Sequence, residues 1–153
     1  MLLQTMKKFT SLVLIILISS ITGIFAQTNQ ENEISKKELK QFASAFKKVQ
    51  VIDQKAQANM VTAVEEEGLE VQRYNEIQQA QQDPDQEVDA TPEELNKYET
   101  ASEELETIRE QARQQMHEKI IDEGFSINRY QEIAVAIQND PELQQKLQEY
   151  LQG

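Results

Sequence analysis

Apolar residues recur about every 3.6 positions along two long stretches of the chain, which is the period of an amphipathic α-helix. The first stripe consists of Leu39, Phe42, Ala45, Val49, Ile52, Ala56, Met60 and Val64. The second stripe consists of Leu95, Tyr98, Ala101, Leu105, Ile108, Ala112, Met116 and Ile120. Every residue of the second stripe follows its counterpart by 56 positions (95 − 39 = 56), so the pattern predicts two copies of one long helix.

Both helices are expected to begin with a capping box. In such a box a Ser or Thr and a Glu three positions later satisfy backbone N–H groups of the first turn. Ser35 and Glu38 form the first box, and Thr91 and Glu94 form the second. The first long helix is then expected to run to about residue 66 or 67.

An almost identical elbow segment follows each helix: residues 67–77 read EGLEVQRYNEI, and residues 123–133 read EGFSINRYQEI. Gly68 and Gly124 stand where a left-handed residue closes a helix, a conformation that glycine adopts without strain. The apolar residue after each glycine is expected to pack on the residue five positions before it, as in a Schellman closure. The elbow residues are Val64, Glu67, Gly68, Leu69, Arg73, Tyr74, Ile77, Ile120, Glu123, Gly124, Phe125, Arg129, Tyr130 and Ile133.

The expected role of the elbows is structural, as hinges that start a shorter helix at a fixed angle. A second interpretation is a ligand site at Arg73 and Tyr74 or at Arg129 and Tyr130. Arg beside Tyr on one helical turn can hold a carboxylate or a phosphate.

These elements predict an all-α fold, in which a tandem repeat of long helix, glycine elbow and short helix packs as one helical bundle. Repeat one spans residues 34–82, a polar linker spans 83–90, and repeat two spans 91–139. A short C-terminal closing helix is expected over 140–152, because Asp-Pro is a typical helix start. The apolar residues of its one face are Leu143, Leu147, Tyr150 and Leu151.

The two long helices carry opposite charge in their first halves. Residues 36–55 contain six Lys against two acidic residues, a net +4, whereas residues 92–111 contain seven Glu against two basic residues, a net −5. We expect these stretches to lie side by side in one folded domain over residues 34–153. The linker is long enough for parallel packing, although the sequence does not fix the direction.

The first 26 residues have the pattern of a secretory signal peptide. Lys7 and Lys8 precede an unbroken apolar run, and a small residue, Ala26, comes before the expected cleavage site. This pattern predicts an exported protein, periplasmic or extracellular, with residues 27–33 as a disordered lead-in. A retained membrane anchor is the alternative, because the apolar stretch is just long enough to approach a bilayer span.

Charge and composition narrow the classes of partner and site. Removing Lys7 and Lys8 changes the net charge from −12 to −14, which disfavours nucleic acid and anionic membranes. The chain has no Cys, so it has no disulfide framework and no zinc site of His and thiolate ligands. We expect a protein partner of unknown identity, no membrane contact after signal cleavage, and self-association as an open option.

Candidate chemistry is sparse. His117 is the only histidine and is expected at a helix surface or at the boundary beside the apolar stripe. Residues 83–94 place oxygen ligands at the spacing of a calcium-binding EF-hand loop, but Val88 stands where that loop needs Gly. The sequence therefore predicts no catalytic residue, no bound metal and no cofactor, and a protein that is not an enzyme.

A family resemblance rests on three features: the segment 42–46 (FASAF), the two elbows, and the segment 140–143 (DPEL). On these the chain resembles the exported bacterial family called the domain of unknown function numbered forty-one sixty-eight, in a tandem form that covers about residues 34–151. The resemblance implies export and a helical fold. It implies no established activity, cofactor or catalytic residue.

The leading functional hypothesis is an exported, non-enzymatic protein that acts through protein–protein contact in the envelope. Its long amphipathic helices, of the coiled-coil type, suit self-association or a stress-related or chaperone-like role. One alternative is an acidic, low-affinity binder of divalent cations. Another is a membrane-anchored spacer, if the signal segment is retained.

Overall fold

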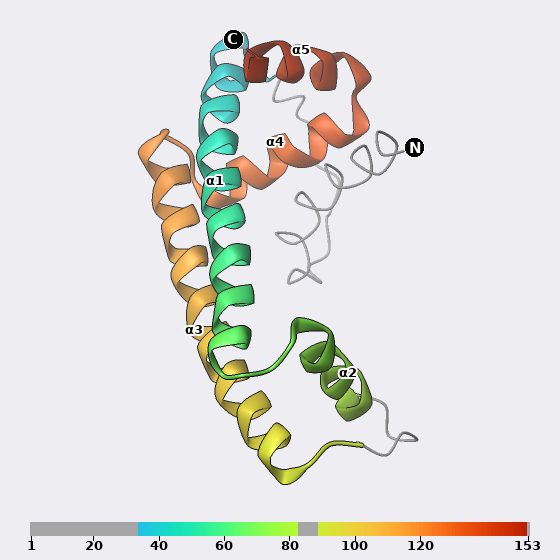
Figure 1. Cartoon of the computed structure of the whole chain (residues 1–153). Coiled ribbons are helices and arrows are strands. Elements are labelled where there is room, and N and C mark those ends of the chain that lie inside the picture. The colour runs from blue at the N-terminus through green and yellow to red at the C-terminus, as the bar shows by residue number, and fades with distance from the viewer. Residues whose placement is uncertain (1–33, 83–88, 153) are drawn as a thin grey trace. The chain divides into compact units, whose positions relative to one another are not determined.

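The computed structural model describes residues 34–82 and 89–152, and within these ranges the chain is helical and contains no strand. Figure 1 shows its five helices in chain order. They are α1 (Lys36–Glu66), α2 (Val71–Gln82), α3 (Pro92–Asp122), α4 (Ile127–Asn139) and α5 (Pro141–Gln152). The all-α fold class with two long helices, two short helices and a closing helix is confirmed.

The described residues form two compact units, and each unit takes segments from both repeats. Unit 1 contains the start of α1 up to Gln50, the end of α3 from His117, and the helices α4 and α5. Unit 2, Val51–Met116, contains the rest of α1, the helix α2 and most of α3. The two copies therefore pack together within each unit.

Chain direction is opposite in the two long helices within each unit. In unit 1 the amide of Gln41, near the start of α1, donates to the backbone carbonyl of Glu123 at the end of α3, at 3.1 Å. In unit 2 the end of α1 packs against the first half of α3, where Val64 shares a core with Leu105. The packing within each unit is antiparallel, which decides a direction that the sequence left open.

The core of unit 1 contains large side chains from three helices that are almost completely buried. Phe42 from α1, Ile120 from α3 and Ile133 from α4 are each less than 2% exposed. The Phe42 ring stacks on Tyr130 with 4.6 Å between ring centroids. Burying such side chains stabilises each by about 1.5–3 kcal/mol, which makes this aromatic contact the centre of the unit.

Unit 2 has a core of the same design from the equivalent positions of the other copy. Its buried members are Ala63, Val64, Leu69, Tyr74, Ala101 and Leu105, with Met60, Val71, Tyr98 and Ile108 partly buried against them. The Tyr74 ring stacks on Tyr98 at 4.8 Å. Each elbow thus packs on the start of the long helix from the other repeat, which is why the helices run antiparallel.

The expected pairing of the basic stretch with the acidic stretch is wrong. Five of the six lysines of residues 36–55 precede Gln50 and lie in unit 1, whereas residues 92–111 lie in unit 2. Among the described residues no ion pair joins the two stretches. Exposed ion pairs contribute only about 0–1 kcal/mol each, so the apolar contacts at the elbows decide the direction instead.

Candidate functional site

The two elbows close their helices with the same backbone hydrogen bonds. Gly68 has φ +76° and Gly124 has φ +90°, the left-handed region that glycine tolerates. In the first elbow the Leu69 N–H donates to the Val64 carbonyl at 3.2 Å, and the Gly68 N–H donates to the Glu65 carbonyl at 2.9 Å. The second elbow repeats both bonds 56 residues later, so each is a Schellman closure.

The residue after each glycine also contacts the helix that follows. In the second elbow Ser126 caps α4 by accepting a hydrogen bond from the Arg129 N–H at 3.2 Å. Phe125, just before this cap, meets Tyr130 edge to face with 6.4 Å between ring centroids. That contact is a hydrophobic staple, and it fixes the angle at which α4 leaves the elbow.

The arginine of the first elbow holds a carboxylate that belongs to the chain itself. Arg73 Nε donates to Glu94 Oε1 at 2.8 Å, and Arg73 Nη2 donates to Glu94 Oε2 at 3.3 Å. Glu94 also accepts from the backbone N–H of Thr91 at 2.8 Å as part of its capping box. The Arg73 side chain, followed by the Thr91 backbone, lowers the pKa of Glu94 to about 2.

The second elbow repeats this contact with the start of the chain's other long helix. Arg129 donates to Glu38 Oε1 from Nε at 3.2 Å and from Nη2 at 3.1 Å. Hydrogen bonding from the Ser35 backbone, aided by Arg129, lowers the pKa of Glu38. The guanidinium groups proposed as ligand holders are therefore engaged by Glu94 and Glu38, two capping-box residues.

Glu123 ties the second elbow to α1 at three points. Its backbone carbonyl accepts from Gln41, and its Oε1 accepts from Ser44 Oγ at 2.9 Å and from Lys48 Nζ. The hydrogen bond from Lys48, followed by that from Ser44, lowers the pKa of Glu123 against the opposing effect of burial. Lys48 and Ser44 are thus part of the hinge.

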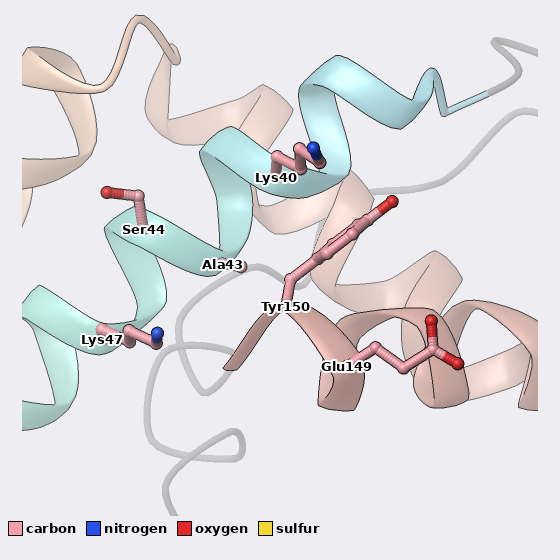
Figure 2. Close-up of a pocket in the computed structure, with 6 residues that line it drawn as sticks. All are labelled: Lys40, Ala43, Ser44, Lys47, Glu149 and Tyr150. Atoms are coloured by element: carbon pink, nitrogen blue, oxygen red, sulfur yellow. The ribbon is translucent and has the colours of Figure 1, made fainter. Parts of the chain in front are cut away.

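A cleft of about 340 Å³ opens in unit 1 between α1 and α5. The residues that line it are Lys40, Ala43, Ser44, Lys47, Glu149 and Tyr150. Lys40 Nζ lies over the Tyr150 ring, 5.4 Å from its centroid, a cation–π distance. Figure 2 shows the amines of Lys40 and Lys47 directed to the Tyr150 side, whereas the Glu149 carboxylate extends away from α1.

Comparison with known proteins places the chain in a family. The model of the family described as Domain of unknown function (DUF4168) matches two consecutive segments, residues 17–88 and 85–147. The chain belongs to this family. The two matches correspond to the two repeats, so the tandem form of DUF4168 is confirmed. No curated protein and no solved structure matches the chain.

The DUF4168 repeat brings the predicted elbow residues together in two separate groups. Val64, Leu69, Tyr74 and Ile77 belong to the first group, and Ile120, Phe125, Tyr130 and Ile133 belong to the second; all are buried. The arginines, at the edge of each group, are about a quarter to a third exposed, at 24% for Arg129 and 32% for Arg73. The arrangement positions helices, and no buried side-chain nitrogen or oxygen atom of the described residues lacks a hydrogen-bond partner.

The α1–α5 cleft of this DUF4168 chain was missed in the sequence. Lys40 and Lys47 were expected to pair with acidic residues of the other copy, and Tyr150 was expected to face the core. The one usable signal was that the FASAF segment places Ala43 and Ser44 between two lysines on one face of α1. Small residues between long ones leave room above the helix, but α5 has to be placed before a cleft can be recognised.

His117 agrees with the sequence, and several other predicted features lie outside the described residues. His117 is half-buried on α3, at the boundary between core and surface. The signal segment 1–26, the lead-in 27–33 and the first half of the EF-hand-like stretch, residues 83–88, fall outside the described ranges. Within those ranges no group of three metal-ligating His, Asp or Glu residues comes together, and none of the helices is long and apolar enough to span a membrane.

Proposed function

We propose that this DUF4168 protein is an exported, non-enzymatic helical protein that acts through protein–protein contact in the bacterial envelope. The observation that carries the proposal is a basic surface that the fold leaves open. One face of the first half of α1 carries five lysines: Lys36, Lys37, Lys40, Lys47 and Lys48. Of these five lysines only Lys48 takes part in an ion pair, with Glu123.

The fold uses its other polar clusters for its own stability, which supports a binding role over catalysis. Arg73 and Arg129 hold capping-box carboxylates, and Glu123 is bound by α1. The buried side chains of the described residues are apolar or aromatic. What remains free is charged surface, and charged surface governs how fast and how selectively proteins meet.

Site-specific cross-linking in the native host tests this proposal. A photoreactive residue at position 47 of the full chain, which borders the cleft, is compared with one at Gln72, an exposed residue of α2. We expect a discrete protein adduct from position 47 and none from position 72, with the partner identified by mass spectrometry. The absence of any protein adduct from position 47, or the same adducts from both positions, would overturn the proposal.

The export part of the proposal has its own test. N-terminal sequencing of the protein recovered from the envelope should give a start at Gln27, as the signal pattern at residues 1–26 predicts. A start at Met1 in a membrane fraction would instead identify an anchored spacer. Recovery from the cytoplasm would contradict export itself.

A further inference from the structure

We propose that the cleft between α1 and α5 receives acidic side chains from the first half of α3 of a second copy of this chain. This inference rests on the proposed function and names its partner. It starts from two surfaces of opposite charge, one in each unit, that no ion pair of the described residues connects. Lys40 and Lys47 border the cleft, and Glu99 and Glu103 project from α3.

The basic surface is shaped to take a carboxylate. Lys40 and Lys47 are both exposed, they lie seven positions or about 10 Å apart along α1, and they have Ala43 and Ser44 between them. Ala43 is 1% exposed, so it forms a floor and projects no side chain into the cleft. Tyr150 draws Lys40 over its ring, which holds that ammonium group at the rim.

The acidic surface occupies the equivalent place in the other copy of the repeat. Adding 56 to Lys47 gives Glu103, so the charge is reversed at this matching position, and adding 56 to the neutral Ala43 gives Glu99, a second negative charge. Both glutamates are exposed, and in the described part of the chain neither takes part in an ion pair. Glu99 and Glu103 share one helical face because they are four positions apart.

The lysines of the cleft belong to unit 1 and the two glutamates belong to unit 2, and no ion pair of the described residues joins them. A second copy of the chain carries the complementary surface, so no other protein is needed as the partner. The whole chain carries a net charge of −12, so two copies repel at long range and attract only where the lysines meet the glutamates. Contact between such copies is therefore specific in orientation and sensitive to salt.

The two surfaces are different, so the contact is head-to-tail. Each copy that joins through its cleft still presents its own Glu99 and Glu103, and growth continues beyond a dimer unless two copies close on each other. Association is expected to be weak, since each exposed ion pair contributes little.

Charge reversal with rescue tests the inference. Sedimentation equilibrium of the exported form is compared for the wild type, for K40E/K47E, and for E99K/E103K. We expect the wild type to associate at about 50 mM salt and to dissociate at about 500 mM, where charges are screened within a few ångströms. Each double variant should weaken association by about tenfold or more, and an equimolar mixture of the two variants should restore it.

K55E/K146E is the matched control, because it changes the net charge by the same amount at two exposed lysines outside the cleft. It should leave more of the association than K40E/K47E does, and all variants should keep the wild-type circular dichroism. A wild type that stays monomeric at low salt overturns the inference. So does a control that is as damaging as K40E/K47E, or a mixture that fails to associate. A cross-link from position 47 to a different protein, with no self-association, overturns the inference but leaves the proposed function standing.

Discussion

The two elbows share one backbone design but differ in what lies behind the tyrosine. In unit 2 the Tyr74 hydroxyl lies 3.0 Å from Ser102 Oγ, and Ser102 Oγ itself donates to the Tyr98 carbonyl at 2.7 Å. The repeat equivalent of Ser102 in unit 1 is Phe46 (102 − 56 = 46), which stacks with Phe42 at 6.1 Å. One hinge has a polar second layer and the other an aromatic one.

This difference separates what the elbow requires from what it tolerates. The glycine, the apolar residue after it, the arginine and the tyrosine serve the same contacts in both units. The residue behind the tyrosine can be Ser or Phe because it contacts the hinge without forming it. Unit 1 is therefore expected to depend more on buried aromatic area, and unit 2 more on hydrogen bonds.

Truncating the stacked ring on the long helix should give the largest effect. Phe42 is 0% exposed, so Phe42→Ala should lower the free energy of unfolding by about 3–5 kcal/mol. Tyr98→Ala, at the equivalent but only half-buried position, should cost about 1–3 kcal/mol. Urea unfolding followed by circular dichroism measures both, and equal losses would contradict the proposed difference between the units.

The elbow glycines should give intermediate and equal effects. Gly68→Ala and Gly124→Ala each force an L-residue into a positive φ, which costs about 1–2 kcal/mol. The two sites also offer similar room for a methyl group. An added Cβ would meet only side-chain atoms at ordinary contact distances, Lys97 Nζ at 3.7 Å from position 68 and Gln41 Nε2 at 3.6 Å from position 124. Unfolding curves of the single variants check this expectation, and a cost at one glycine only would show that the elbows are not equivalent.

Removing the tyrosine hydroxyls should separate the units by a smaller amount. Tyr74→Phe loses the bond to Ser102 and should cost about 0.5–1.5 kcal/mol. Tyr130→Phe should be close to neutral, because its ring contacts are aromatic. A double-mutant cycle of Tyr74→Phe with Ser102→Ala isolates the hydrogen bond. A coupling free energy near zero would show that this bond does not stabilise unit 2.

The smallest effects are expected from the capping-box carboxylates, because solvent screens their partly exposed ion pairs. The pKa of Glu94 falls from 4.5 to about 2 in the folded chain. A carboxyl with a lowered folded pKa stabilises the fold above its unfolded pKa, and this contribution disappears as the pH falls through the folded pKa. The destabilisation by Glu94→Gln should thus be complete at pH 6 and shrink between about pH 5 and pH 2.

Glu38→Gln provides the comparison in unit 1. The pKa of Glu38 is also lowered, so Glu38→Gln should also destabilise the fold more at pH 6 than at low pH. The pKa of Glu94 is lowered further, so the destabilisation by Glu94→Gln should persist to lower pH. Denaturant unfolding of both variants and the wild type at pH 6, 4 and 3 tests this order. An effect of Glu94→Gln that does not change with pH would show that the Arg73 contact contributes nothing through charge.

Local features of the fold could be predicted from the sequence because their partners are close in the chain. Gly68 and Leu69 select a helix closure through bonds to residues three and five positions back, and spacing alone reveals this. The capping boxes are equally local. The helical period of the stripes identified the core positions for the same reason, since each stripe is a property of one helix.

Distant contacts could not be predicted from the sequence. Arg129 pairs with Glu38, which is 91 positions away in the sequence, and the direction of helix packing decides which carboxylate Arg129 can reach. The complementary charges of residues 36–55 and 92–111 suggested a direct pairing that the structure does not contain. They misled because exposed charge is a weak determinant beside stacked, buried rings such as Phe42 and Tyr130. The cleft between α1 and α5 could not be predicted for the same reason, because it exists only once the direction of helix packing is known.

Because each unit takes segments from both repeats, the two units can fold only in a certain order while the chain is being synthesised. Unit 2 is an uninterrupted run of chain from Val51 to Met116, so every contact in it can form before the last helices are made. The first part of α1 has to wait, because its partners begin only at His117. Closing so long a loop carries an entropic cost that the nearer pairs avoid. The first half of α1 is therefore synthesised before unit 2 but packs after it.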